Sequence, residues 1–170
     1  DFVIIGPATD PAGVKGKSVT EAMKLFATGK APFVSRGDDS GTHKKELSLW
    51  KAAEVSIPEK AEWYLQAGQG MGQTIQMAAE RNGYTMADRG SYIKYEDSKK
   101  GKPELVVLVE GDKVLFNQYS VIAVNPKNCP SVKNDLAKKF ADWIVSSAGK
   151  KIIEDFKLLG KTLFTFNAGK

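Results

Sequence analysis

The sequence contains a single cysteine, Cys129, and a single histidine, His43. One cysteine cannot form a disulfide within the chain, so a fold held together by internal disulfides is excluded. A structural zinc site takes about four closely spaced ligands, mainly cysteine and histidine, and no such cluster is present. We therefore expect neither a metal ion nor a cofactor, and a fold that depends on its hydrophobic core.

Long apolar runs are also missing. The longest is LVVLV at 105–109, whereas a membrane-spanning helix needs about 20 apolar residues. The first residues, DFVIIGP, contain neither the basic segment nor the cleavage site of a signal peptide. We expect these residues to form a strand that belongs to a longer chain.

Concentrated positive charge is the third feature that the sequence lacks. The net charge is +5, but the lysines occur singly or in pairs and do not form a cluster interleaved with aromatic residues. Nucleic-acid-binding proteins usually gather basic residues on one face, so we expect no nucleic-acid partner. A mildly basic surface does favour small anions.

Strand-like and helix-like segments alternate along the chain, and 42% of the residues are hydrophobic, which is typical of a globular protein. This alternation predicts an α/β fold. Residues 84–95 are expected to form a strand, a polar turn and a short helix. The other predicted strands are 1–7, 31–35, 105–109 and 114–126, and the other predicted helices in this part are 19–28, 43–54, 58–62 and 74–81.

Two of these helices carry clear end signals. Ser18 followed by Glu21 has the spacing of a capping box, which predicts that a helix begins at the next residue after Ser18. Asn82 and Gly83 follow the helix at 74–81, and both tolerate the left-handed conformation that often ends a helix. The sequence therefore predicts where the first of these helices begins and where the second ends.

The C-terminal part contains a strongly amphipathic helix. Leu136, Phe140, Trp143 and Ile144 fall on one face at helical spacing. A face with two large aromatic side chains needs an apolar partner of similar size. We expect this helix to pack against a structure outside its own segment.

The segment SRGDDSGTHKKE at 35–46 lies where a predicted strand gives way to a helix. Residues 37–39 favour a turn, and residues 40–42 open a helix whose first amides have no acceptor inside the helix. A glycine among them lets the backbone approach a ligand, and Arg36 adds a planar fork of charged donors. Together these features predict a site for an oxygen-rich anion.

A simpler interpretation of this segment is purely structural. Ser40 or Thr42 would cap the helix, an aspartate would satisfy the turn amides, and Arg36 would pair with that aspartate. However, Thr42 lacks the glutamate three residues later that a capping box requires, because Glu46 is four residues away. Capping therefore does not explain the whole segment, and both interpretations stay open on the residues alone.

Three other functions find little support. The segment PAGVKGKS has Pro11 where a phosphate-binding P-loop needs glycine, and GQGMGQ has Gln73 where a dinucleotide-binding loop needs its third glycine. Asp39, Ser40 and His43 are the residue types of a hydrolytic triad, but neighbours at a helix start project in different directions. We expect a binding protein and not an enzyme.

Residues 35–46 carry a family resemblance together with GQGMGQTIQMAAERNGYTMADRGSYI at 68–93 and VLFNQYSVIAVNP at 114–126. They resemble the tungstate-binding receptors of tungstate ABC importers, in the two-lobed periplasmic-binding-protein superfamily (type II). The resemblance covers essentially the whole chain. It implies a lobe with a three-layer αβα sheet at 6–115, which carries the anion-binding loop. Residues 116–170 would form a return strand and C-terminal helices that belong to the other lobe.

The resemblance also implies roles for individual residues. Arg36 would be the cationic donor, with hydroxyl and amide donors around the helix start and a backbone rim from the second glycine-rich loop. The aspartates would hold the loops, because they repel an anion. The implied ligand-binding residues are Ser35, Arg36, Ser40, Gly41, Thr42, Gly70, Met71 and Gly72, and the implied supporting residues are Asp38, Asp39, Asp88, Arg89 and Ser91.

The function that the resemblance implies is that of a periplasmic or otherwise extracytoplasmic receptor. It would bind tungstate or molybdate non-covalently and present it to the membrane permease of an ABC importer. The N-terminal segment of the first lobe is not among these residues, so we expect that segment, or a second copy of the chain, to complete the cleft. The alternative is an oxyanion-sensing effector domain of a transcriptional regulator on the same fold.

Overall fold

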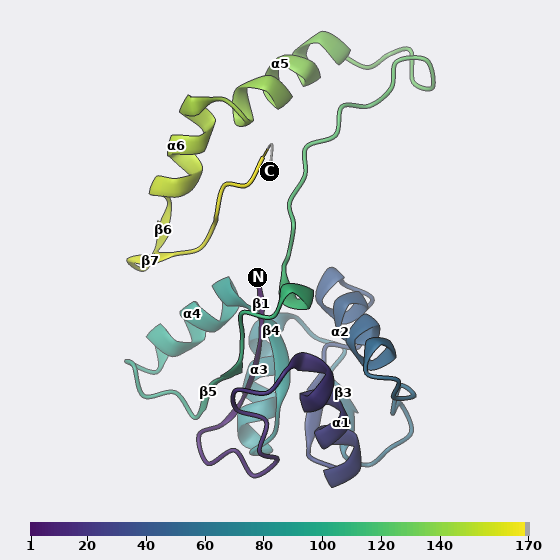
Figure 1. Cartoon of the computed structure of the whole chain (residues 1–170), viewed down its shortest axis with the longest axis vertical. Coiled ribbons are helices and arrows are strands. Elements are labelled where there is room, and N and C mark those ends of the chain that lie inside the picture. Colours follow the sequence, from purple (N-terminus) through teal and green to yellow (C-terminus); the bar gives the residue numbers. More distant parts are fainter. Residues whose placement is uncertain (169–170) are drawn as a thin grey trace. The chain divides into compact units, whose positions relative to one another are not determined.

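The computed structural model of the chain describes residues 1–168 (Figure 1). The chain divides into two compact units, Asp1–Asn117 and Gln118–Lys170, called unit 1 and unit 2 below. No described helix is both long and apolar enough to cross a membrane. Among the described residues, the extensive hydrophobic clusters lie in unit 1.

Unit 1 alternates strands and helices, as the sequence predicts. Its elements, in chain order, are β1 (Phe2–Pro7), α1 (Val19–Gly29), β2 (Phe33–Ser35), α2 (Gly41–Ala52), β3 (Tyr64–Gln66), α3 (Met71–Glu80), β4 (Thr85–Asp88), α4 (Arg89–Ser98), β5 (Leu105–Val109) and the 3-10 helix η1 (Lys113–Leu115).

The strands of unit 1 form a mixed sheet. β1 lies between β4 and β5 and runs antiparallel to both, whereas β2 and β3 pair in parallel. A parallel bridge between Phe33 and Tyr84 joins β2 to the strand that continues as β4, and the Val34 amide donates to the Tyr84 carbonyl at 2.8 Å. The strands therefore lie in the order β3-β2-β4-β1-β5.

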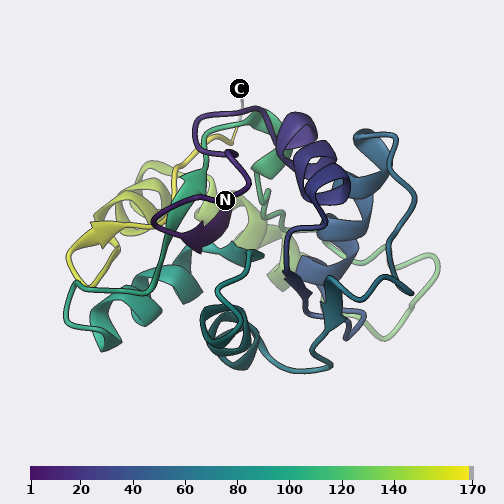
Figure 2. The ribbon, with the colours of Figure 1, turned by 90° about the horizontal axis from the view of Figure 1, so that it is seen from below.

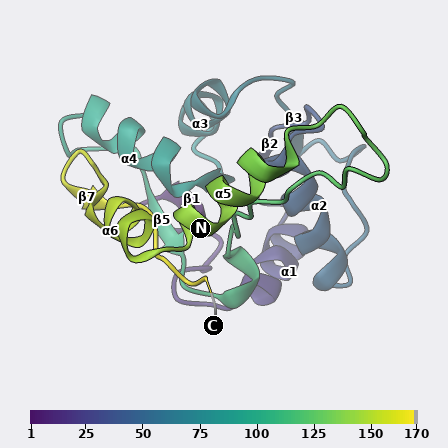
Figure 3. The same ribbon diagram turned by 90° about the horizontal axis from the view of Figure 1, so that it is seen from above.

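Helices cover both faces of this sheet. Alternate residues of β1 point to opposite faces: Phe2 and Ile4 belong to the core cluster that contains α1 and α2, and Val3 and Ile5 belong to the cluster that contains α3 and α4. Views from the two ends show α1 and α3 on opposite sides of β1 (Figures 2 and 3). Unit 1 is thus the three-layer αβα arrangement that the family resemblance implies.

One edge of the sheet collects the starts of three helices. β2, β3 and β4 run in the same direction, so their carboxyl ends lie at one edge, which we call the carboxyl edge. β5 also ends there and β1 begins there, because β1 is antiparallel to both of its neighbours. α2, α3 and α4 begin within a few residues of this edge. Ligands of open α/β sheets bind in this position.

The two predicted helix-end signals are confirmed. Ser18 accepts a hydrogen bond from the Glu21 amide and the Glu21 side chain accepts one from the Ser18 amide, so the capping box is complete and α1 begins at Val19. After α3, Asn82 has a φ of 49°, in the left-handed region. Local sequence signals fix these ends because each requires only residues of the same turn.

Several predicted segments differ from the structure. The helix predicted at 74–81 is α3, which begins three residues earlier, at Met71, and ends at Glu80. The helix predicted at 43–54 begins two residues earlier, because Ser40 serves as its N-cap, and it ends at Ala52. No helix forms at 58–62, where two successive turns instead close onto β3 at Tyr64. No separate polar turn precedes α4, because Asp88 ends β4 and caps the helix at once.

The strand predicted at 114–126 is also wrong. Lys113–Leu115 form η1, and the residues that follow, through 125, have no strand assignment. A strand needs a neighbour for its backbone groups, and no described strand pairs with this segment. The segment has the composition of a strand, but its backbone forms no inter-strand hydrogen bonds with a described strand.

Unit 2 contains two helices and a small hairpin: α5 (Asn134–Ile144), α6 (Ser147–Asp155), β6 (Lys157–Leu158) and β7 (Lys161–Thr162). The apolar face predicted for its helix is exposed: Leu136 is 59%, Phe140 52% and Trp143 43% exposed. None of the large apolar side chains described in unit 2 is buried. The described residues therefore leave the apolar face of this helix uncovered.

Candidate anion-binding site

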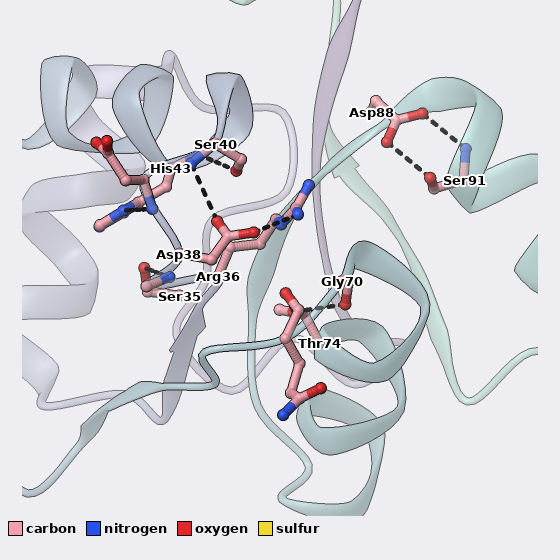
Figure 4. Close-up of polar contacts among 12 residues, drawn as sticks. Ser35, Arg36, Asp38, Ser40, His43, Gly70, Thr74, Asp88 and Ser91 are labelled. Carbon is pink, nitrogen blue, oxygen red and sulfur yellow. Dashed lines mark hydrogen bonds and ion pairs between the residues drawn. The ribbon is translucent and has the colours of Figure 1, made fainter.

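Arg36 lies at the carboxyl edge, directly after β2. Its Nη2 atom donates to Asp38 Oδ2, two residues further along the turn (Figure 4). Its Nε atom is buried, and no described residue accepts a hydrogen bond from it. A buried donor without an acceptor is uncommon in folded proteins, so Arg36 retains capacity to bind an anion.

The N-terminus of α2 adds amide donors beside Arg36. The Ser40 hydroxyl accepts from the His43 amide at 3.2 Å, which is normal capping. No described residue accepts a hydrogen bond from the amides of Gly41 or Thr42. These two amides are therefore available to a ligand, as expected of a helix start that binds anions.

The N-terminus of α3 contributes a second set of amides. Gly70 is the N-cap and has no side chain to bind them, and no described residue accepts from the amides of Met71 or Gly72. The loop before α3 is tied to the Arg36 segment, because the Gly68 amide donates to the Arg36 carbonyl at 2.8 Å. The structure therefore brings the two glycine-rich segments of the sequence together.

Ser35 is fully buried and lies behind this surface. Its hydroxyl accepts from the Gly37 amide at 3.2 Å, and it lies close enough to the carboxyl group of Glu46 to lower the pKa of that group. A fully buried hydroxyl that is hydrogen-bonded within the turn positions the turn more readily than it reaches a ligand. Ser35 therefore lies behind the surface on which the other implied ligand residues are found, and supports the turn that carries Arg36.

Glu46 also belongs to this region and is not among the site residues that the sequence predicts. It is 3% exposed and lies on the inner face of α2. Burial raises the pKa of Glu46, and the hydrogen bonds from Ser35, Tyr64 and Trp50 oppose that rise only in part. The signal was present in the sequence: Glu46 occupies the same helical face as Leu49 and Trp50, where an acid is unusual.

Asp88, Ser91 and Arg89 belong to the start of α4. Asp88 accepts from the Ser91 amide at 2.8 Å and from the Ser91 hydroxyl at 2.7 Å (Figure 4). Arg89 donates to both carboxylate oxygens of Asp1, at 2.6 and 2.8 Å, and to Glu110 at 2.7 Å. These residues thus contact one another and the ends of β1 and β5, and no contact joins them to Arg36 among the described residues.

The residues of the hydrolase alternative do not form a triad. The Asp39 amide donates to His43 Nδ1 at 3.0 Å, and the Asp39 carboxylate lies 3.4 Å from Lys44 Nζ. The contact between Ser40 and His43 uses the backbone amide of His43 and not its imidazole. The described residues also contain no group of three or more histidine, cysteine or acidic side chains that could hold a metal ion.

Comparison with known proteins identifies relatives of the whole chain. Residues 1–148 match the family described as the PBP superfamily domain. The tungstate-binding protein TupA of Campylobacter jejuni is 49% identical over 168 residues, which are 99% of this chain and 62% of that protein. The chain therefore spans about three fifths of the length of that relative.

Two solved structures resemble the chain closely. The tungstate-binding protein TupA from Desulfovibrio alaskensis G20 has a TM-score of 0.93 and 64% identity, covering 99% of this chain and 67% of that one. The tungstate ABC transporter structure from Geobacter sulfurreducens has a TM-score of 0.74 and 53% identity. The match covers 92% of this chain and 64% of that one. Both relatives carry tungstate in their names, and both extend beyond the region that this chain covers.

Proposed function

The chain belongs to the PBP superfamily, and we propose that it forms the larger part of an extracytoplasmic receptor for tungstate or molybdate. In this proposal the oxyanion lies at the carboxyl edge of unit 1 and is held without covalent chemistry, so the protein is not an enzyme. The observation that carries the proposal is the buried Arg36 Nε without an acceptor among the described residues, beside unbonded amides of two helix starts. The names of the relatives support the choice of ligand.

The chemistry of the site suits a tetrahedral dianion. A guanidinium group presents a planar fork to oxygen pairs, and the amides at the starts of α2 and α3 add oriented dipoles of the correct sign. Tungstate and molybdate have the same charge and nearly the same shape, so the proposal includes both. The aspartates near the site are not ligands in this proposal, because a carboxylate repels a dianion.

The residues of unit 1 are expected to form one wall of the site only. A charged hydrogen bond contributes about 1.5 to 3 kcal/mol and a helix terminus about 0.3 to 1 kcal/mol. Nanomolar affinity corresponds to about 12 kcal/mol, which these contributions do not reach. We propose that residues 6–115 act as one lobe and that the facing lobe supplies the remaining contacts.

The exposed face of unit 2 supports the same division. Residues 116–170 would belong to the facing lobe, whose N-terminal segment, or a second copy of the chain, would cover Phe140 and Trp143. Closure of the two lobes around the anion would produce the form that a membrane permease recognises. The ABC transporter named among the relatives supports a permease partner and a location outside the cytoplasm.

Calorimetric titration of the full-length protein with tungstate, molybdate, sulfate and phosphate tests the proposal. We expect tungstate and molybdate to bind, and Arg36→Ala to weaken both by at least about a hundredfold, the loss of a charged donor pair. Arg81→Ala is the matched control, because it removes an exposed arginine at the opposite end of α3 and should leave affinity unchanged. Absence of binding by all four anions, or full affinity in Arg36→Ala, would overturn the assignment.

A further inference from the structure

Asp38 holds the hydrogen-bond donors that an oxyanion would use at this site. Its Oδ2 atom accepts from Arg36 Nη2, and its Oδ1 atom accepts from the Ser40 amide at 3.2 Å. Figure 4 shows the carboxylate between the guanidinium group and the start of α2. A carboxylate is itself an oxyanion, so Asp38 satisfies these donors with the same chemistry as a ligand.

The contact with Arg36 is incomplete. Nε and Nη2 form one edge of the planar guanidinium group, and an oxyanion bound to that edge accepts from both atoms. Asp38 accepts from Nη2, while Nε has no acceptor among the described residues. Asp38 therefore provides one of the two bonds that an ideally placed tetrahedral oxyanion would provide.

The backbone next to Asp38 packs closely against the following strand, which favours an exchange in which only the side chain moves. Gly37 has a φ of 57°, and a Cβ placed on it would lie 2.7 Å from Gln66 Cβ, which holds the turn against the next strand. The Asp38 side chain itself is about one-fifth exposed. Part of the side chain therefore already faces the solvent toward which it would rotate.

We propose that Asp38 is an internal competitor of the oxyanion, which leaves the Arg36 and Ser40 donors when the anion binds. This inference rests on the proposed function and adds a residue that limits affinity. A dianion and the carboxylate cannot share these donors without strong repulsion, since like charges at such distances are unfavourable. Binding is then an exchange of one anion for another, and the release of Asp38 lowers the net affinity.

The neighbouring aspartate provides a matched control. Asp39 is adjacent in sequence and carries the same charge, but its side chain is 86% exposed and lies near Lys44. Asp39→Asn and Asp38→Asn each remove one negative charge from the same turn. Only Asp38→Asn removes the negative charge that contacts Arg36. The carboxamide oxygen that it introduces still accepts from the Ser40 amide.

The test is titration of the full-length wild type and both variants with tungstate. We expect Asp38→Asn to bind about tenfold more tightly than wild type, and Asp39→Asn to stay within about twofold. In an Arg36→Gln background the gain from Asp38→Asn should disappear, because Asp38 acts through Arg36. Thermal unfolding verifies that each variant folds, and Asp38→Ser, which keeps a small turn-forming acceptor, replaces Asp38→Asn if it does not.

The outcomes separate this inference from the proposed function. If Asp38→Asn binds no more tightly than Asp39→Asn, or more weakly than wild type, then Asp38 orients Arg36 and the competitor role is wrong. In that case wild-type binding still supports the receptor function. If wild type binds none of the anions, the proposed function itself fails.

Discussion

Tyr64 and Glu46 share a buried hydrogen bond of 2.6 Å between the start of β3 and the inner face of α2. The same Oε1 atom of Glu46 accepts from Trp50 Nε1 at 2.9 Å. Burial, followed by the Glu46 charge and hydrogen bond, raises the pKa of Tyr64, so its hydroxyl keeps its proton and remains the donor. The Glu46 carboxyl group also interacts with Ser35 at the end of β2. It therefore links Tyr64 to the segment that carries Arg36.

Replacement of Glu46 should therefore affect stability strongly. Glu46→Ala leaves the Tyr64 hydroxyl and the Trp50 indole without their acceptor, and we expect a loss of about 3 kcal/mol in the free energy of unfolding. Glu46→Gln keeps an acceptor for both groups and should cost much less. Urea unfolding of the two variants beside wild type measures the difference, and equal losses would contradict a specific role for the oxygen atom.

The pH dependence of stability should reveal the same group. Because the folded-state pKa of Glu46 lies above its ordinary value of 4.5, the folded protein holds a proton that the unfolded chain releases. Its contribution is complete below 4.5 and is lost as the pH rises through the folded-state pKa. We expect Glu46→Gln to gain stability relative to wild type over this rise, measured by unfolding at successive pH values. A constant difference between the two proteins would show that this pKa is not raised.

Gly41→Ala should separate binding from folding. A Cβ at Gly41 meets no atom within 4 Å, and alanine favours a helix by about 0.5 to 1 kcal/mol over glycine. The added methyl group would stand among the amides at the start of α2, so we expect equal or higher thermal stability with about tenfold weaker tungstate binding. Gly29→Ala, also unobstructed, is the control and should retain full affinity. Unchanged affinity in Gly41→Ala would exclude close approach of the anion to this backbone.

Gly6 lies where the sheet permits no side chain. A Cβ there would overlap Tyr84 Cδ1, and the Tyr84 hydroxyl is fixed by its bonds to Asp10 and the Ala12 amide. We expect Gly6→Ala to lower the free energy of unfolding by about 3 kcal/mol, because the ring cannot move freely. Chemical denaturation measures this loss, and a loss below about 0.5 kcal/mol would show that the ring adapts.

Arg89 should stabilise the carboxyl edge by holding two strands. It binds Asp1 before β1 and Glu110 after β5. We expect Arg89→Met to increase amide hydrogen exchange at Phe2 and Val109 and to destabilise unit 1 by about 1 to 2 kcal/mol. Lys99→Met, which removes an ion pair with the largely exposed Glu104, is the comparison and should have a smaller effect. Similar exchange in both variants would contradict this role.

Short-range patterns predicted the parts of the fold that depend on neighbouring residues. Ser18 and Glu21 lie within one turn, so the start of α1 could be predicted correctly. The segment 114–126 has strand-like composition but no described strand partner, and composition cannot supply a partner.

The candidate site shows the same limit. Pairing of Arg36 with an aspartate of its turn is one of the interpretations that the residues leave open, and the structure contains it. The cluster around Glu46 could not be predicted, because it requires Tyr64, which approaches only through the pairing of β2 with β3.

The position of β1 between β4 and β5 has a consequence for how unit 1 folds during synthesis. Ile4 pairs with Met86 on one side and Val109 on the other, residues that follow it by 82 and 105 positions. Such distant pairings form slowly, because the entropy of closing a long loop is lost before the new contacts stabilise the fold. β1 therefore leaves the ribosome well before β5, the last of the described strands that pair in its sheet. Until Val109 emerges, the backbone of β1 has no complete set of partners and is vulnerable to aggregation or to capture by a chaperone.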